Sequence, residues 1–306
     1  MTGLSVSTTV RKSRLAVTLA VTGALVFAGS TVAVADPTGA LGFGSSALGS
    51  SQELVAPTPR LASVDNFRDV AGDGAGYRGV GGVQMNRGVF YRSNALLPND
   101  ADLAALDGLG ITAVYDLRTE PEIVGKEDRL PANATYTWLP TLSGNLGGIS
   151  GKLKSPADAV AFMQDLNRSF VTDAAVRASF ATLFNSLADT SGAQIVHCTS
   201  GKDRTGWTSA LLQSVVGVPW DTIMADYLLT NEYSRVSIDR QLAGAAAASG
   251  PEMAAIYSPI LHVDASYLEA GFAQLEADYG TVYNYLLTGL NLSPQTIAVL
   301  VNKLVG

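Results

Sequence analysis

The sequence predicts an α/β protein in which helices flank a central, mostly parallel sheet. Apolar runs rich in β-branched residues at 111–115 and 194–196 each end abruptly in a polar loop, as buried parallel strands do. Around these runs, apolar residues recur at helical spacing, and strands that alternate with helices favour parallel pairing. About 250 residues follow the N-terminal leader, which is enough for one such domain with a sizeable core.

Residues 1–35 have the pattern of a secretory signal peptide. They contain three basic residues, no acidic residue, and an uncharged run that ends in Ala33-Val34-Ala35. Small residues at that place are typical of a cleavage site, so we expect cleavage after Ala35 and a secreted protein. The alternative is an uncleaved membrane anchor, because the uncharged run of 21 residues is long enough to span a bilayer.

Composition limits the possible partners of the chain. Removal of residues 1–35 lowers the net charge from −7 to −10, so nucleic acid is not an expected partner. Residues 36–59 are rich in Gly, Ser, Ala and Pro, which predicts a flexible leader before a domain at 60–306. Cys198 is the only cysteine, so no internal disulfide can form, and a free thiol in an exported protein usually has a catalytic reason.

The first part of the domain is expected to contain short strands and one helix. Residues 82–84 and 89–91 have strand character and flank the turn Asn86-Arg87-Gly88, which predicts a hairpin. A helix is expected to start near Pro98, with Asn99 or Asp100 as its N-cap, and to run through Leu109.

The second part is predicted to be mainly helical. Residues 142–188 contain a glycine-rich stretch, and their pattern predicts two helices, at 156–168 and 173–188, which would form a helical insertion. The first of these helices is a candidate for a mobile lid over the site, because glycines precede it. Residues 221–305 are almost entirely helical in pattern.

The most informative segment is His-Cys-Thr-Ser-Gly-Lys-Asp-Arg-Thr-Gly at residues 197–206. A strand precedes it and an apolar helix follows, so free backbone N–H groups at the helix start can bind an anion. Arg204 and Lys202 favour a thiolate at Cys198, and the guanidinium of Arg204 can grip two phosphoryl oxygens. The candidate phosphate-binding residues are Thr199, Ser200, Gly201, Lys202, Arg204 and Thr205.

At these residues the chain resembles the cysteine-dependent protein tyrosine phosphatase superfamily, whose signature is His-Cys, five residues, then Arg followed by Ser or Thr. The form found here resembles the bacterial and fungal branch. Further similar segments lie at residues 66–70, 91–96, 116–122 and 226–231. The resemblance implies a phosphatase-type sheet and hydrolysis of phosphotyrosine, with phosphoserine, phosphothreonine or phosphoinositides as further possible substrates.

The resemblance assigns Cys198 as the nucleophile of a phosphocysteine mechanism, but it leaves two candidates for the general acid. Many members carry this acid on a Trp-Pro-Asp loop, whereas this chain has only Trp-Leu-Pro-Thr at 138–141. Asp203 is the first candidate, and its alternative role is to cap the following helix. Asp116, at the neighbouring strand end, is the second candidate, and it would otherwise orient Arg204 through a salt bridge.

Other function classes fit the sequence less well. A thiol reductase would need a second, resolving cysteine. A catalytically silent phosphate-binding module is the remaining alternative, although Cys198, Asp203, Arg204 and Thr205 are all present. Two distant histidines and one cysteine do not form a conventional zinc site, and no cofactor is expected. The expected partner is a phosphorylated protein or a phosphoinositide. A membrane is an expected partner only if the signal segment stays uncleaved.

Overall fold

A computed structural model describes residues 57–142 and 153–306 of the chain. The predicted signal peptide, nearly all of the predicted leader and the glycine-rich stretch before the proposed lid lie outside these residues. Within the described ranges, every helix is too short or too polar to cross a bilayer.

A five-stranded sheet forms the centre of the domain, with the order β1-β2-β5-β3-β4. The strands β2, β5, β3 and β4 run parallel, and the short β1 is antiparallel to β2. The mostly parallel sheet that the sequence predicts is therefore confirmed. The strands are β1 (Arg68–Asp69), β2 (Phe90–Ser93), β3 (Ile111–Asp116), β4 (Thr135–Trp138) and β5 (Ala193–His197).

Helices surround this sheet and make up most of the chain after residue 153. In chain order they are α1 (Asp100–Asp107), α2 (Glu120–Ile123), α3 (Pro156–Thr172), α4 (Ala174–Asp189), α5 (Asp203–Val215), α6 (Trp220–Tyr233), α7 (Arg235–Ser249), α8 (Pro251–Leu261), α9 (Ala265–Tyr279), α10 (Val282–Asn284) and α11 (Pro294–Val305). A short 3-10 turn, η1 (Val80–Gly82), precedes β2, and one π-helical turn, η3 (Tyr285–Gly289), follows α10.

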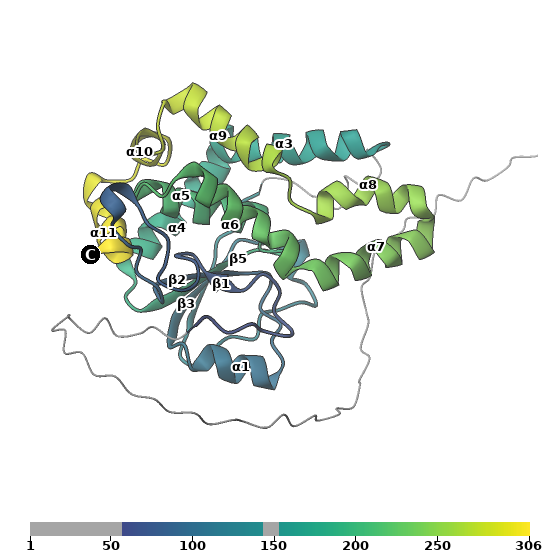
Figure 1. The fold of residues 1–306 in the computed structure, drawn as a ribbon, viewed down its shortest axis with the longest axis horizontal. Helices are drawn as coiled ribbons and strands as arrows, with labels where there is room; N and C mark the ends of the chain where they lie inside the picture. The colour runs from purple at the N-terminus through teal and green to yellow at the C-terminus, as the bar shows by residue number, and fades with distance from the viewer. Residues whose placement is uncertain (1–56, 143–152) are drawn as a thin grey trace, which may run out of the picture. The chain divides into compact units, whose positions relative to one another are not determined.

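The strands β2, β3 and β5 are buried along nearly all of their length, and their successive side chains point to opposite faces of the sheet. Val114 and Ile195 pack with Leu106 of α1 in the smaller core. Tyr115 and Val196, the next residues of the same strands, join the larger core with α4 and α5. Figure 1 shows this division, with α1 on one side of the sheet and α4, α5 and α6 on the other. This double burial explains why the strands appear as continuous apolar runs in the sequence.

The segment at residues 198–203, called the signature loop below, is followed by α5, which is buried along most of its length. Its Trp207 is fully buried and contacts the rings of Phe170, Phe272 and Tyr285. Helices from both the insertion and the C-terminal part therefore hold α5 against the sheet. This packing fixes the position of the loop at the start of α5.

The predicted cap at Asn99 is confirmed, whereas the predicted hairpin is wrong. The side chain of Asn99 accepts a hydrogen bond from the backbone N–H of Asp102 and caps α1. No strand forms at residues 82–84: η1 ends at Gly82, where Gly81 and Gly82 adopt positive φ angles of 69° and 75°, and Gln84 makes only an isolated antiparallel bridge with Arg78. The strand β2 pairs with β1, a segment in which the sequence indicated no strand.

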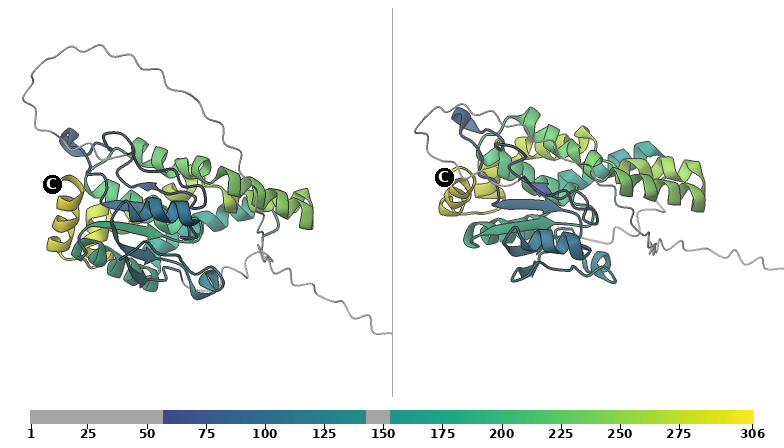
Figure 2. Two further views of the ribbon diagram at one scale, coloured as in Figure 1. Left: turned by 90° about the horizontal axis from the view of Figure 1, so that it is seen from below. Right: turned by 60° about the horizontal axis from the view of Figure 1, so that its bottom comes forward.

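The helical insertion consists of α3 and α4, close to the predicted boundaries. α4 packs its apolar face into the larger core, whereas α3 lies along α8 and α9. α7 and α8 lie side by side in both views of Figure 2, as in Figure 1. The lid remains a hypothesis, and the helix expected to form it is in contact with the C-terminal helices.

Candidate active site

The signature loop joins β5 to α5 at the carboxyl edge of the sheet. Asp116, the last residue of β3, pairs in parallel register with His197, so the two predicted polar strand ends do lie side by side. Cys198 follows directly and is only 2 % exposed. Parallel sheets bind ligands at this edge, and the structure places the only cysteine there.

A network of hydrogen bonds turns the carbonyl groups of the loop away from its centre. Gly201 O accepts from Asn66 Nδ2 at 2.7 Å and from Arg92 Nη2 at 2.8 Å, and Ser200 O accepts from the same Asn66 at 3.3 Å. In the described part of the chain, no group accepts a hydrogen bond from the backbone N–H groups of residues 199–204. These donors are free to bind an anion, as an anion-binding nest requires.

Gly201 allows the sharp turn of this loop. Its φ is +64°, and a Cβ at this position would lie 2.2 Å from the carbonyl oxygen of Ser93. Only glycine fits, since both the backbone angle and the contact with β2 exclude a side chain.

Arg204 is held by a carboxylate that the sequence reasoning did not single out. Its Nη2 lies 2.6 Å from Oε1 of Glu122, and its Nη1 lies 2.9 Å from Oε2 and 2.9 Å from Leu117 O. Thr199 also donates its hydroxyl to Glu122. Burial alone would raise the pKa of Glu122, but the bonds from Arg204 outweigh it and lower the pKa to about 2.

Asp116 does not make the expected salt bridge to Arg204. It accepts hydrogen bonds from Arg118, at 2.8–3.0 Å, and from the hydroxyl of Tyr136 at 2.8 Å. Burial would raise the pKa of Asp116, yet the Arg118 bonds hold it below the ordinary value. A fully buried carboxylate that is kept ionised in this way is poorly suited to donate a proton, so the geometry favours the other candidate acid.

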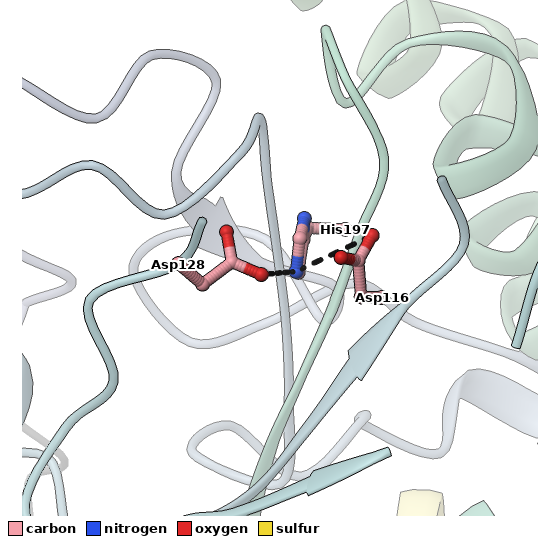
Figure 3. A group of neighbouring side chains, drawn as sticks. All are labelled: Asp116, Asp128 and His197. Carbon is pink, nitrogen blue, oxygen red and sulfur yellow. Dashed lines mark ion pairs between the residues drawn. The ribbon is translucent and has the colours of Figure 1, made fainter. Parts of the chain in front are cut away.

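Asp116, Asp128 and His197, the residue before Cys198, form a cluster of side chains (Figure 3). The Nε2 atom of His197 lies 3.0 Å from Asp128 Oδ2 and 3.9 Å from Asp116 Oδ1. The ligand atoms are close enough for a metal ion, but the Nη2 atom of Arg118 lies 2.8 Å from a carboxylate oxygen of each aspartate. Because the guanidinium of Arg118 already pairs with both carboxylates and occupies the position beside them, the cluster does not fit a metal cation.

Asp203 is the first residue of α5 and stands beside the loop. Its side chain is 13 % exposed, and one carboxylate oxygen lies 3.7 Å from the ammonium of Lys202. The other oxygen is buried and has no hydrogen-bond partner in the described structure. The alternative prediction of an N-cap is wrong, because Lys202 occupies the cap position and no side chain caps the helix there.

Lys202 and Thr205, both predicted phosphate ligands, are buried side chains in this structure. Lys202 is 5 % exposed, and its ammonium donates to the carbonyl oxygens of Ile260 and His262, at the end of α8. Burial lowers the pKa of Lys202. The hydroxyl of Thr205 is buried and has no hydrogen-bond partner among the described residues.

Cys198 lies among cationic groups. Arg204, Arg92 and Lys202 all interact electrostatically with it. Burial opposes the charge of Arg204, but negative charge at Cys198 and Glu122 raises the pKa of the guanidinium. The sulfur of Cys198 therefore lies within electrostatic reach of three cationic side chains.

The sequence reasoning also missed the buried support of the loop. Asp226, on α6, lies 2.9 Å from Arg68 and 3.1 Å from Arg92, the residue that bonds Gly201. Asn66 bonds the loop from a backbone conformation with a positive φ of 61°. The sequence did contain a signal for these residues, because they lie in segments that resemble segments of the family, at residues 66–70, 91–96 and 226–231. Only the fold shows which of these residues contact one another.

Comparisons with known proteins agree with this geometry. A family model described as "Tyrosine phosphatase family" matches residues 59–306. A Cupriavidus necator protein, whose name provisionally assigns it to the tyrosine-protein phosphatases, is 33 % identical over 79 % of this chain and 92 % of its own length. Triple specificity protein phosphatase PtpB of Mycobacterium tuberculosis is 30 % identical over 72 % of this chain and 90 % of its own length.

Among solved structures, P. aeruginosa TpbA in complex with pTyr is 20 % identical, with a TM-score of 0.25, and the match covers 47 % of this chain and 70 % of that one. The family model spans far more than half of the sequence, and both curated relatives cover most of it. The chain belongs to the tyrosine phosphatase family.

Proposed function

We propose that this protein hydrolyses phosphotyrosine in proteins through a phosphocysteine intermediate on Cys198. The observation that carries the proposal is the loop of residues 199–204, which follows Cys198 and whose backbone N–H groups have no acceptor in the described structure, while Glu122 holds Arg204 at the end of the loop. Such preorganised donors stabilise the charge that develops on the equatorial oxygens of a phosphoryl group in transfer.

The proposed reaction has two displacement steps. The thiolate of Cys198 attacks phosphorus, an S–P bond forms, and the bond from phosphorus to the tyrosine oxygen breaks with its electron pair. Asp203 supplies a proton to the departing oxygen. Water then attacks phosphorus, the S–P bond breaks, the thiolate is restored, and inorganic phosphate leaves.

Asp203 is proposed as the general acid because of its position and its lack of other partners. Its carboxyl group adjoins the loop, is partly accessible, and has one oxygen without a hydrogen bond. After donating its proton, the same group can accept one from the attacking water in the second step. The contacts of Asp116 with Arg118 and Tyr136 leave it no comparable role.

Phosphoserine, phosphothreonine and phosphoinositides are possible further substrates. The relative PtpB carries the name of a triple specificity phosphatase. Lys202 would have to leave the carbonyl groups of Ile260 and His262 before its ammonium could bind a second phosphate. This cost favours substrates with one phosphate.

A substrate panel tests these assignments. The purified protein is assayed on a phosphotyrosine peptide, a matched phosphoserine peptide and vesicles that contain a phosphoinositide, with Cys198→Ser as the inactive control. We expect the highest rate on phosphotyrosine and no phosphate release by the control. Phosphate binding without turnover on any substrate would instead support a catalytically silent phosphate-binding module.

Export of the protein is part of the proposal, and residues 1–35 support it through their sequence pattern. We expect the mature chain to begin at Asp36 and to be recovered outside the cell membrane. N-terminal sequencing of the protein from fractionated cells tests this. An intact N-terminus in the membrane fraction would support the uncleaved anchor instead.

A further inference from the structure

A cavity lies beside the proposed active site, at the outer edge of the sheet. It has a volume of about 260 Å³ and is lined by Glu120, Ile123, Val124, Glu127, Tyr136 and Trp138. These residues come from α2, the turn after it and the edge strand β4. None of them belongs to the signature loop, and the mechanism above uses none of them.

The lining of this cavity combines aromatic and apolar surface with carboxylates. Trp138 is 46 % exposed and Val124 is 71 % exposed, which is unusual for such large apolar side chains. Glu120 and Glu127 supply negative charge, and no basic side chain lines the cavity. Aromatic faces attract cations, so aromatic rings next to carboxylates select a ligand with an apolar stem and a positive end.

The two aromatic rings are held in place from behind. The hydroxyl of Tyr136 donates to Asp116 at 2.8 Å, and the indole N–H of Trp138 donates to Arg118 O at 2.7 Å. With their polar atoms bound to the end of β3, the rings present carbon surface to the cavity. A site that is rigid before binding loses little conformational entropy when a ligand enters.

The cavity is close to the nucleophile. Trp138 pairs with Asp116, and Asp116 pairs with His197, so Trp138 and His197 are in register on strands two positions apart. Neighbouring strands are about 4.8 Å apart, which puts the end of β4 roughly 10 Å from the start of the signature loop. An extended peptide covers this distance in about three residues.

Helix α2 separates the two sites and contributes to both. Glu122 points to Arg204, while Glu120 and Ile123 line the cavity. Within α2, residues 120 and 123 are three positions apart and share one helical face, whereas residue 122 lies on another. Val124 and Glu127 line the cavity from the turn that follows the helix.

We propose that this cavity binds the basic side chain, lysine or arginine, of a phosphorylated protein substrate, and thereby selects phosphotyrosines with a basic residue within about three positions. This inference rests on the proposed function. The aliphatic stem of such a side chain would cover Val124 and Trp138, and its charged end would meet Glu120 and Glu127. Phosphate on the neighbouring tyrosine would occupy the signature loop at the same time.

The test compares two phosphotyrosine peptides that differ at one position, arginine or glutamine, scanned over the three residues on each side of the tyrosine. A small aryl phosphate without a peptide serves as the internal standard. At the favoured position we expect kcat/KM to be about five- to tenfold higher for the arginine peptide. Raised ionic strength should reduce this ratio.

Two variants assign the preference to the cavity. The double variant Glu120→Gln with Glu127→Gln should bring the arginine peptide to the rate of the glutamine peptide, with the aryl phosphate unaffected. Val124→Lys should do the same, because it places a positive charge in the cavity. The matched control is Glu269→Gln with Glu276→Gln, two exposed acidic residues of α9, which should keep the full preference.

The outcomes separate the two claims. If the arginine and glutamine peptides are hydrolysed at equal rates at every scanned position, and the aryl phosphate is also hydrolysed, this inference is overturned and the proposed function stands. An arginine preference that survives the Glu120 and Glu127 double variant would also overturn it. Failure to hydrolyse any of the three compounds would overturn both.

Discussion

Arg204 and Glu122 form a two-point ion pair, with N···O distances of 2.6 and 2.9 Å, between the start of α5 and α2. The pair is largely buried, and Thr199 adds its hydroxyl to the same carboxylate. The plane of a guanidinium held in this way cannot rotate without breaking both contacts to Glu122. Its remaining N–H groups therefore keep one orientation, in which they are available to a phosphoryl group.

We predict that Glu122→Gln lowers kcat/KM for a phosphotyrosine peptide by about 10- to 100-fold, since Arg204 loses the charge that positions it. The variant should remain folded at neutral pH, with a free energy of unfolding lower by about 3 kcal/mol, which corresponds to the fall of the Glu122 pKa from 4.5 to about 2. Denaturant titration and steady-state kinetics measure the two effects.

The pH dependence of this loss has a definite sign. The pKa of Glu122 is lower in the folded protein than in the unfolded chain, so its stabilisation is complete above about pH 4.5 and disappears as the pH falls towards 2. The stability difference between the wild type and Glu122→Gln should therefore shrink over that range. Glu252→Gln, on the exposed surface of α8, is the control, and a difference that stays constant down to pH 2 would contradict the prediction.

Asp203→Asn should slow the hydrolysis of aryl phosphates with poor leaving groups much more than those with good ones. The reason is that only a poor leaving group needs a proton in the transition state, where a positioned acid contributes about 100- to 10,000-fold. A series of substituted phenyl phosphates measures this as a steeper dependence of kcat/KM on the pKa of the leaving phenol. Equal losses across the series would argue against a proton donor.

Gly201→Ala should abolish activity and reduce stability strongly, because the new Cβ would lie 2.2 Å from the carbonyl oxygen of Ser93. Gly74→Ala is the matched control. It has almost the same φ, +63° against +64°, but open space around the added Cβ. The control should lose only about 1–2 kcal/mol and keep full activity. Thermal unfolding and kinetics compare the two variants, and similar losses in both would mean that the contact with β2 is unimportant.

Removal of the charge of Asp226 should destabilise the fold by about 3–5 kcal/mol, because Asp226→Asn leaves Arg68 and Arg92 buried without a counter-charge. The exposed pair of Arg235 and Asp239 provides the control, since Asp239→Asn should cost less than about 1 kcal/mol. Urea unfolding measures both. A cost for Asp226→Asn as small as that of the control would show that the buried network does not support the loop.

The lid hypothesis gives a further prediction. α3 packs on α8, and the end of α8 binds Lys202, so a phosphate analogue in the loop should raise the hydrogen-exchange protection of α3. Hydrogen exchange followed by mass spectrometry, with and without the analogue, measures this. The same protection in both states would mean that α3 is scaffold.

Local patterns were sufficient for the elements whose residues interact mainly with their sequence neighbours. The cap at Asn99, the strand that ends at Asp116 and the helix after Cys198 all followed from short-range signals. The hairpin prediction failed because strand character at residues 82–84 is a weaker determinant than the positive φ angles of Gly81 and Gly82, which interrupt extended backbone there. The pairing of β1 with β2 depends on contacts 22 to 24 residues apart, which periodicity does not reveal.

The sequence by itself determined which groups of the proposed site lie together: the proposed nucleophile Cys198, the proposed anion-binding loop and Arg204 occupy one continuous segment, so their proximity is a consequence of covalent connection. Only the tertiary structure decided which carboxylates serve that segment. It brought Glu122 to Arg204 and tied Asp116 to Arg118, which leaves Asp203, within the same segment, as the proposed acid. An ion pair between distant residues depends on how helices and strands pack, and that packing is a property of the whole core.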